Sequence, residues 1–221
     1  MRNPLLLGHR GVRGVKALPE NTFPAFDFAM SQGCDGFEFD VRLSADGQAV
    51  ICHDAKTRRG SVAKYSAEEL ALPLLRDVLQ RYQNSAFLDI ELKVAGLEKL
   101  IIDLLGEYRP AKGYVISSFL ADVLNDVNRL NSELPLGLIC ETASQFAEWQ
   151  NLPVQFVIPH YKLARPDAIA RLKSEGRKVI VWTVNSAADM LRFSKSAEGI
   201  ISDHPESLVA ALRSQSLNPP K

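Results

Sequence analysis

The stretch GFEFDVRLSADGQAVICHD, residues 36–54, decides the fold and contains the first candidate site. Its first half alternates three apolar residues with Glu38, Asp40 and Arg42. Because successive side chains of a strand point to opposite faces, Glu38 and Asp40 share one face. This pattern is typical of either an amphipathic surface strand or the wall of a metal site.

A turn signal follows this strand and sends the chain back along it. Asp46 and Gly47 favour a tight turn, and the apolar run 49–52 then leads to His53 and Asp54. Two acids and a histidine are therefore expected at the ends of adjoining strands. These residue types carry chemistry, which favours a functional site over a plain surface strand.

Composition and charge limit the kind of protein. The 221 residues suit one domain, predicted over residues 1–221, and 46% hydrophobic with 24% charged residues is ordinary for a globular protein. The 26 basic and 26 acidic side chains balance, so no nucleic-acid partner is indicated. Cys34, Cys52 and Cys140 are scattered and odd in number, and we expect reduced thiols.

The first residues contain one short apolar run. Its three leucines, residues 5–7, are too few for the core of a signal peptide or for a membrane span. We therefore expect a cytoplasmic protein with no membrane span, unless a leader precedes this numbering.

Strand and helix patterns alternate along the chain. Besides the opening stretch, strands are expected at residues 5–7, 86–93, 114–118, 136–140, 154–159, 178–184 and 199–202. Helices are expected at about 23–30, 66–82, 97–108, 121–130, 143–149, 187–195 and 205–213, with a further helix after Pro166. Eight strand–helix units predict an α/β protein, a (β/α)8 TIM barrel with a short insertion between its second and third strands. An open doubly wound sheet is the alternative, but no glycine-rich phosphate motif follows the first strand.

Chemically active side chains gather at the predicted carboxyl ends of the strands, where barrels of this kind hold their active sites. Glu38, Asp40 and Glu91 offer oxygen ligands for one divalent cation, Mg²⁺ or Ca²⁺, with Mn²⁺ also suitable. Arg10 and Lys93 add positive charge, which together with a metal attracts a phosphoryl group. Glu91 and Lys93 could instead form a structural ion pair.

Two histidines are candidates for proton transfer. His9 and His53 suit a general acid and base, because histidine titrates near neutral pH and phosphodiester cleavage moves two protons. His160 is open between a substrate-binding role and a hydrogen-bonded loop role. Trp182 could border the site or pack on the outer face of the barrel.

For three further residues a purely structural role is open. Glu20 and Asn21 could merely cap the first helix, and Asp89 is expected to lie deeper in the barrel with a structural role.

The motifs as a set resemble those of the glycerophosphodiester phosphodiesterase family. In chain order they are GHRG (8–11), PENT (19–22), GCDGFEFDV (33–41), DGQAVICHD (46–54), ELK (91–93), SSF (117–119), WTVN (182–185) and GIISDHP (199–205). They span most of the chain, and the set is specific although WTVN or ELK alone would be weak.

This resemblance implies a metal-dependent phosphoric diester hydrolase that converts glycerophosphodiesters to glycerol 3-phosphate and an alcohol. By residue, it implies metal ligands at Glu38, Asp40 and Glu91, a catalytic pair at His9 and His53, phosphate contacts from Arg10 and Lys93, and a substrate border at Phe119 and Trp182.

The segment between two of these motifs departs from the family. Residues 54–90, which separate His53 from Glu91, number only 37, whereas family members usually carry a longer insertion here. A small cap over the site is therefore expected. Two alternatives stay open: a phosphodiesterase for lipid substrates, similar to lysophospholipase D or sphingomyelinase D, and a non-catalytic barrel that binds phosphate esters.

Overall fold

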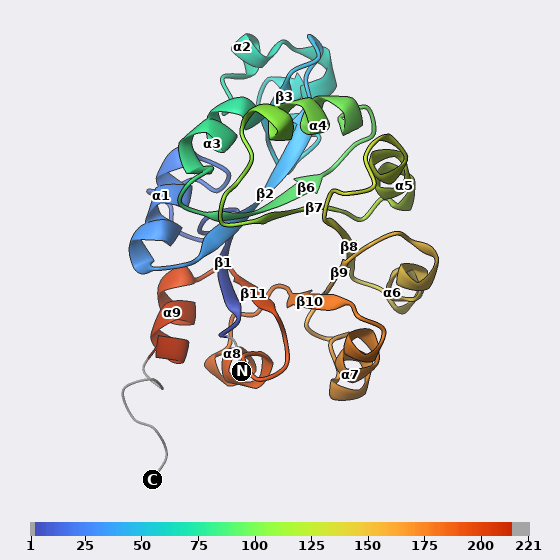
Figure 1. The fold of residues 1–221 in the computed structure, drawn as a ribbon. Coiled ribbons are helices and arrows are strands. Elements are labelled where there is room, and N and C mark those ends of the chain that lie inside the picture. Colours follow the sequence, from blue (N-terminus) through green and yellow to red (C-terminus); the bar gives the residue numbers. More distant parts are fainter. Residues whose placement is uncertain (1–2, 214–221) are drawn as a thin grey trace.

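A closed ring of parallel strands forms the centre of the protein (Figure 1) in a computed structural model that describes residues 3–213. The ring runs in the order β1 (Leu5–His9), β2 (Gly36–Leu43), β6 (Phe87–Leu92), β7 (Tyr114–Ser118), β8 (Leu136–Cys140), β9 (Phe156–Pro159), β10 (Lys178–Val181) and β11 (Gly199–Ser202). It closes because β1 pairs in parallel with both β2 and β11. The predicted (β/α)8 barrel is confirmed. The prediction of one domain over residues 1–221 reaches beyond the described residues and stays a prediction.

Helices cover the outside of the ring (Figure 1). They are α1 (Phe23–Gln32), α3 (Leu75–Tyr82), α4 (Glu98–Glu107), α5 (Ala121–Leu130), α6 (Ala143–Ala147), α7 (Pro166–Ser174), α8 (Ala187–Phe193) and α9 (Pro205–Arg213). Local signals fix their ends: the Thr22 side chain accepts the Ala25 N–H at the start of α1, and Gly33, with φ 94°, ends it. Within residues 3–213, no helix combines the length and the apolar character that crossing a membrane requires.

Side chains of the barrel strands point alternately outward and inward, and they form an apolar layer under the helices and a second one inside the barrel. Leu88, Ile90 and Leu92 on the outer face of β6 belong to the main core, together with residues of the helices. A second cluster, which includes Leu7 and Phe87, fills the barrel interior. The intervening positions on β2 and β6 are polar, and they lie in register: Glu38 pairs with Asp89 and Asp40 with Glu91. The barrel thus holds its carboxylates side by side.

The segment between β2 and β6 forms a small cap. β3 (Ala49–Ile51) pairs antiparallel with the end of β2, as the turn at Asp46 and Gly47 predicts. The cap continues through β4 (Lys56–Thr57), β5 (Gly60–Ser61), the 3-10 helix η1 (Val62–Lys64) and α2 (Ala67–Leu70).

The single helix predicted over residues 66–82 is wrong. Ser66 and Glu69 form the expected capping box of α2, but the backbone turns left-handed at Ala71, with φ 52°, and α3 begins only at Leu75. Pro73 explains the interruption, because proline has no N–H to donate and disfavours helical backbone in the residue before it.

Other boundaries shift by a few residues. The strand predicted over residues 178–184 ends at Val181, and the strand predicted over 154–159 begins at Phe156. The helix predicted over 143–149 ends at Ala147 and continues as the 3-10 helix η2 (Glu148–Asn151).

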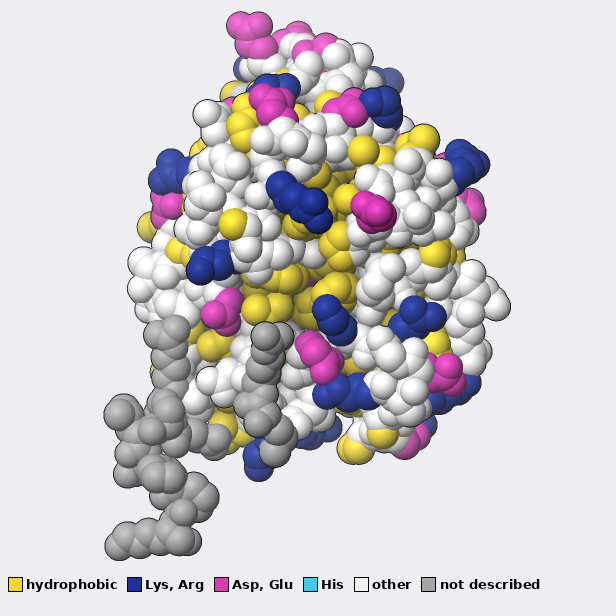
Figure 2. Space-filling model, in the orientation of Figure 1, with side chains coloured by type: hydrophobic (Ala, Val, Ile, Leu, Met, Phe, Trp, Pro, Cys, Tyr) yellow, Lys and Arg dark blue, Asp and Glu magenta, His cyan; other side chains and the backbone are white. Residues whose placement is uncertain are grey.

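The amino-terminal ends of the strands surround a different surface. A cavity of about 640 Å³ is lined there by apolar Leu5, Phe87 and Phe156 and by Lys112 and Lys178 among other residues. Figure 2 shows a face with a central hollow where hydrophobic side chains gather, Lys and Arg side chains around it, and no coloured histidine. The histidines predicted for catalysis belong to the other end of the barrel.

Candidate active site

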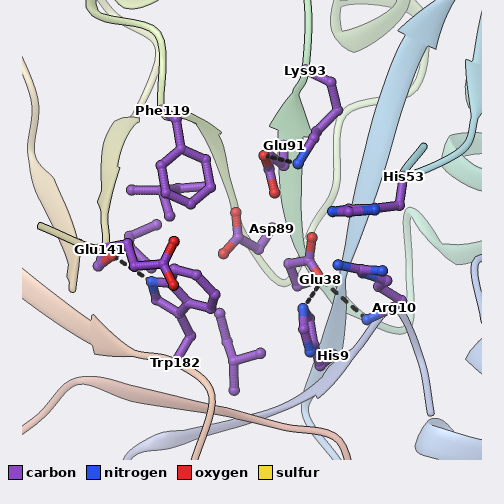
Figure 3. A pocket seen from close by; sticks show the side chains of 13 residues that line it. His9, Arg10, Glu38, His53, Asp89, Glu91, Lys93, Phe119, Glu141 and Trp182 are labelled. Atoms are coloured by element: carbon purple, nitrogen blue, oxygen red, sulfur yellow. Dashed lines mark hydrogen bonds and ion pairs between the residues drawn. The ribbon is translucent and has the colours of Figure 1, made fainter. Parts of the chain in front are cut away.

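The carboxyl-terminal ends of β1, β2 and β6 bring most of the predicted site residues together. One cavity of about 300 Å³ is lined by His9, Arg10, Glu38, His53, Asp89, Glu91, Lys93, Phe119, Ile139, Glu141, Ile158, Trp182 and Ile201 (Figure 3). Asp40 lies beside Glu91 in the sheet register and is fully buried. Residues from opposite ends of the sequence therefore share one pocket.

Glu38, Asp40 and Glu91 form a compact acidic group. Each offers a ligand atom that lies within 4.8 Å of the others, and all three residues are buried. Within the described chain, the buried Glu38 Oε1 accepts no hydrogen bond, and the buried Asp40 Oδ1 has only the ammonium group of Lys93, at 3.3 Å. Buried oxygens of this kind normally have a partner, so the donor set fits a divalent cation.

Burial makes the negative charge of this group costly. It raises the pKa of Glu38 well above its usual value, and the neighbouring charge of Asp40 adds to the effect. Burial also raises the pKa of Glu91 and of Asp89 to about 7. Burial opposes ionisation of Asp40 as well, but Arg10 and Lys93 hold its pKa below the usual range.

The raised pKa values predict that stabilisation by a divalent cation grows with pH. Between the ordinary carboxyl pKa and about 7, the folded protein without metal holds more protons on Glu91 and Asp89 than the unfolded chain does. Its stability therefore falls as pH rises through this window, and a bound cation offsets the loss. We expect saturating Mg²⁺ or Ca²⁺ to raise Tm by several degrees more at about pH 8 than at about pH 5, since about 1 kcal/mol shifts Tm by roughly 2–4 °C at this size. Thermal unfolding with EDTA or metal measures the difference, and an equal increment at both pH values would contradict it.

Arg10 and Lys93 supply the positive charge beside the acids. Arg10 Nε lies 3.1 Å from Asp40 Oδ2, and Lys93 Nζ lies 2.6 Å from Glu91 Oε1 and 3.3 Å from Asp40 Oδ1. Both cations line the cavity, so they can also meet an anionic ligand. The Glu91–Lys93 ion pair exists and shares the site.

The backbone around Arg10 is shaped to present it. Arg10 has a left-handed φ of 51°, and its N–H donates to Glu38 Oε2 at 3.0 Å. A Cβ at Gly8 would lie 2.0 Å from the Gly11 carbonyl oxygen, and one at Gly11 would lie 2.5 Å from the backbone of Ala25. Both glycines are therefore needed for the tight turn that follows β1.

His9 ends β1 and is held by Asp203, the residue after β11. Its Nδ1 lies 2.6 Å from Asp203 Oδ1, and its Nε2 lies 3.8 Å from Glu38 Oε2. Burial lowers the pKa of His9, against the opposing effect of Asp203. Burial would raise the pKa of Asp203, but the hydrogen bond with His9 and that from Asn185 lower it to about 2. The ionised aspartate favours a proton on Nδ1, which leaves Nε2 of the neutral ring as the acceptor.

Replacing Asp203 with asparagine is expected to move the His9-dependent limb of the pH–rate profile to lower pH. The charge of Asp203 raises the pKa of His9 against the effect of burial, so its loss should lower that pKa further. The direction is the same whether His9 acts as acid or as base. A pH profile of kcat/KM for wild type and variant measures the shift. An unchanged limb would show that Asp203 does not set the pKa of the group that controls it.

His53 reaches the cavity from the cap rather than from a barrel strand. It follows β3, and its carbonyl oxygen accepts a hydrogen bond from Arg42 Nε at 2.8 Å. Its Nδ1 lies 2.8 Å from Asp54 Oδ1, and the His53 side chain is 37% exposed. His53 and His9 therefore differ in burial, although each has an aspartate at Nδ1.

Phe119 and Trp182 line the other side of the cavity. Their rings meet edge to face, with centroids 5.7 Å apart, and Trp182 Nε1 donates to the Ile158 carbonyl at 2.9 Å. His160 is not among the residues that line this cavity; its ring packs edge to face against Trp182, with centroids 5.4 Å apart. The substrate-binding role predicted for His160 stays a prediction.

Sequence reasoning missed the partners of the site residues. Glu20 forms ion pairs with Arg10 and Arg13, and the Asn21 side chain donates to Asp40 Oδ2 at 2.8 Å, whereas capping of α1 falls to Thr22. Glu20 and Asn21 belong to the PENT motif, and this motif was the signal in the sequence that could have identified them. Asp203 lay in the GIISDHP motif, but neither its pairing with His9 nor the place of Glu141 in the cavity could be derived from spacing.

The fold and the site define a phosphoric diester hydrolase built on a (β/α)8 barrel. The chain belongs to the glycerophosphoryl diester phosphodiesterase family, whose model matches residues 9–102 and 88–207.

Individual relatives resemble the chain over nearly its whole length. A glycerophosphodiester phosphodiesterase of Caldanaerobacter subterraneus subsp. tengcongensis is 31% identical, over 95% of this chain and 98% of its own. A solved glycerophosphodiester phosphodiesterase of Parabacteroides distasonis has the same fold, with a TM-score of 0.85, 24% identity and coverage of 97% of this chain and 98% of its own. A phosphodiesterase of Oleispira antarctica, solved in complex with the product sn-glycerol-3-phosphate, matches with a TM-score of 0.83 and 25% identity over 96% of this chain and 97% of its own.

Proposed function

We propose that this chain hydrolyses glycerophosphodiesters to glycerol 3-phosphate and an alcohol, with one divalent cation held by Glu38, Asp40 and Glu91. The observation that carries the proposal is that two members of this acidic group, Glu38 and Glu91, line one cavity with His9, His53, Arg10 and Lys93. The product named for the Oleispira phosphodiesterase supports the substrate class.

A divalent cation at the three carboxylates supplies a Lewis acid for a phosphate oxygen or a hydroxyl of the substrate. Mg²⁺ and Ca²⁺ both suit an all-carboxylate donor set. Arg10 and Lys93 line the cavity beside it and bind the phosphate oxygens, so that the charge of the displacement is balanced by the chain itself.

His9 and His53 move the two protons of the reaction. His9 Nε2 accepts the proton of the nucleophile as the new P–O bond forms, which suits a buried ring whose pKa is lowered. His53 donates a proton to the leaving alcohol as the old P–O bond breaks. The nucleophile is either water or the neighbouring glycerol hydroxyl, and a cyclic glycerol phosphate in a single turnover identifies the second route.

Release of glycerol 3-phosphate from glycerophosphocholine tests the proposal. We expect release that EDTA abolishes and that added Mg²⁺, Ca²⁺ or Mn²⁺ restores. Release that persists in full with EDTA would overturn the metal requirement, and absence of release from any glycerophosphodiester would overturn the substrate class.

A phosphodiesterase for lipid substrates would need an apolar rim around the mouth. Within residues 3–213 the exposed large hydrophobic side chains are those of Val15, Leu120 and Leu130. Three exposed side chains are few for the large contiguous apolar patch that marks a membrane-binding or lipid-binding surface. Water-soluble diesters are therefore the preferred class.

A further inference from the structure

The cavity is divided into a charged half and an apolar half. The charged residues and histidines that line the cavity for the proposed mechanism lie on or directly after β1, β2 and β6 or in the cap. The other half is lined by Phe119, Ile139, Ile158, Trp182 and Ile201. A diester that places its phosphate in the charged half extends its remaining atoms over this apolar half.

One acid interrupts the apolar half. Glu141 directly follows β8, which stands across the ring from β1, and it lines the cavity. In Figure 3 its carboxylate lies between Phe119 and Trp182, on the side opposite to Arg10 and His53. Over residues 3–213 no ion pair and no hydrogen bond joins this carboxylate to another side chain.

A carboxylate beside two aromatic rings is suited to an organic cation. An aromatic face attracts an ammonium group, as the Lys93 Nζ 5.7 Å from the centroid of Phe119 illustrates, and the carboxylate adds a Coulombic attraction. Because Lys93 already lies over Phe119, Trp182 is the ring that is left for a cationic head group. The hydrogen bond to Ile158 holds Trp182 in place, so its indole is a fixed part of the wall. An uncharged alcohol gains neither attraction.

We propose that Glu141, Phe119 and Trp182 form a subsite for a cationic head group, which makes diesters of choline and ethanolamine better substrates than diesters of uncharged alcohols. This inference rests on the proposed function and names the substrate class of the same site.

The test compares kcat/KM of wild type and Glu141→Gln for three diesters: glycerophosphocholine, glycerophosphoethanolamine and the uncharged-head glycerophosphoglycerol. We expect the variant to lose about tenfold on the two cationic diesters and less than about twofold on glycerophosphoglycerol. Free choline is expected to inhibit wild type competitively and to inhibit the variant less. Glu175→Gln, which changes another exposed acid, directly after α7, is the matched control and is expected to keep the wild-type preference.

The outcomes separate this inference from the proposed function. An equal loss on all three diesters would place Glu141 at the glycerol or phosphate moiety and overturn the subsite. An unchanged preference in the variant would overturn it too, while activity on glycerophosphodiesters would stand. Failure of wild type to hydrolyse any of them would overturn the function itself.

Discussion

Replacement of His9 by alanine is expected to lower kcat by a factor of about 10²–10⁴ while the barrel stays folded. In the proposed mechanism the buried imidazole of His9 accepts a proton, and Asp203, at 2.6 Å from its Nδ1, orients the ring. Alanine removes this acceptor. Water can fill the space that the ring leaves, but water is a much weaker base than imidazole. Steady-state kinetics on glycerophosphocholine, with circular dichroism to check the fold, measures the effect.

His53→Ala is expected to show a loss in the same range, because the leaving alcohol then lacks its proton donor. His204→Ala is the matched control. His204 lies in the turn before α9, its side chain is 46% exposed, and it does not line the cavity. Turnover close to that of wild type in either His9→Ala or His53→Ala would remove that histidine from the mechanism.

Glu38→Gln is expected to lower kcat/KM about 10³-fold at a metal concentration that saturates wild type. A bound metal lowers the barrier of such reactions by several kcal/mol, and each step of about 1.4 kcal/mol changes the rate about tenfold. The substitution keeps the size of the side chain and removes a negative charge from the buried acidic group. It should therefore weaken divalent-cation binding rather than folding. A higher metal concentration should recover part of the activity.

Glu98→Gln provides a matched control for a buried glutamate. Glu98 is 9% exposed, its Oε2 accepts the Gly96 N–H, and it begins α4 away from the cavity. Isothermal titration with Mg²⁺ or Ca²⁺ compares the two variants with wild type. Unchanged metal affinity in Glu38→Gln would exclude Glu38 as a ligand.

The acidic group could be predicted because its geometry is local. Period-two alternation places Glu38 and Asp40 on one face of β2, and the turn signal at Asp46 and Gly47 returns the chain through β3 to His53. Glu91 repeats the pattern on the strand that is next in the ring. The helix break at Pro73 had a signal of its own, which the capping box at Ser66 outweighed.

The pairing of His9 with Asp203 could not be derived in this way. The two residues are 194 positions apart and meet only because the last strand closes the ring against the first. Contacts of this kind depend on strand register, which alternation does not fix between distant strands. The place of His160 against Trp182, and of Glu141 in the cavity wall, likewise depends on how loops leave the barrel.

The two histidines differ in how they are anchored. His9 belongs to a strand that is paired on both sides within the barrel, whereas His53 follows β3, a three-residue strand attached to the end of β2. Opening of β3 exposes its three buried residues, Ala49, Val50 and Ile51, but breaks none of the strand pairs that close the ring. With His53 as the proposed proton donor, we expect opening of the cap to stop turnover while amide protons of the barrel remain protected from exchange, so that loss of activity and global denaturation become separate events.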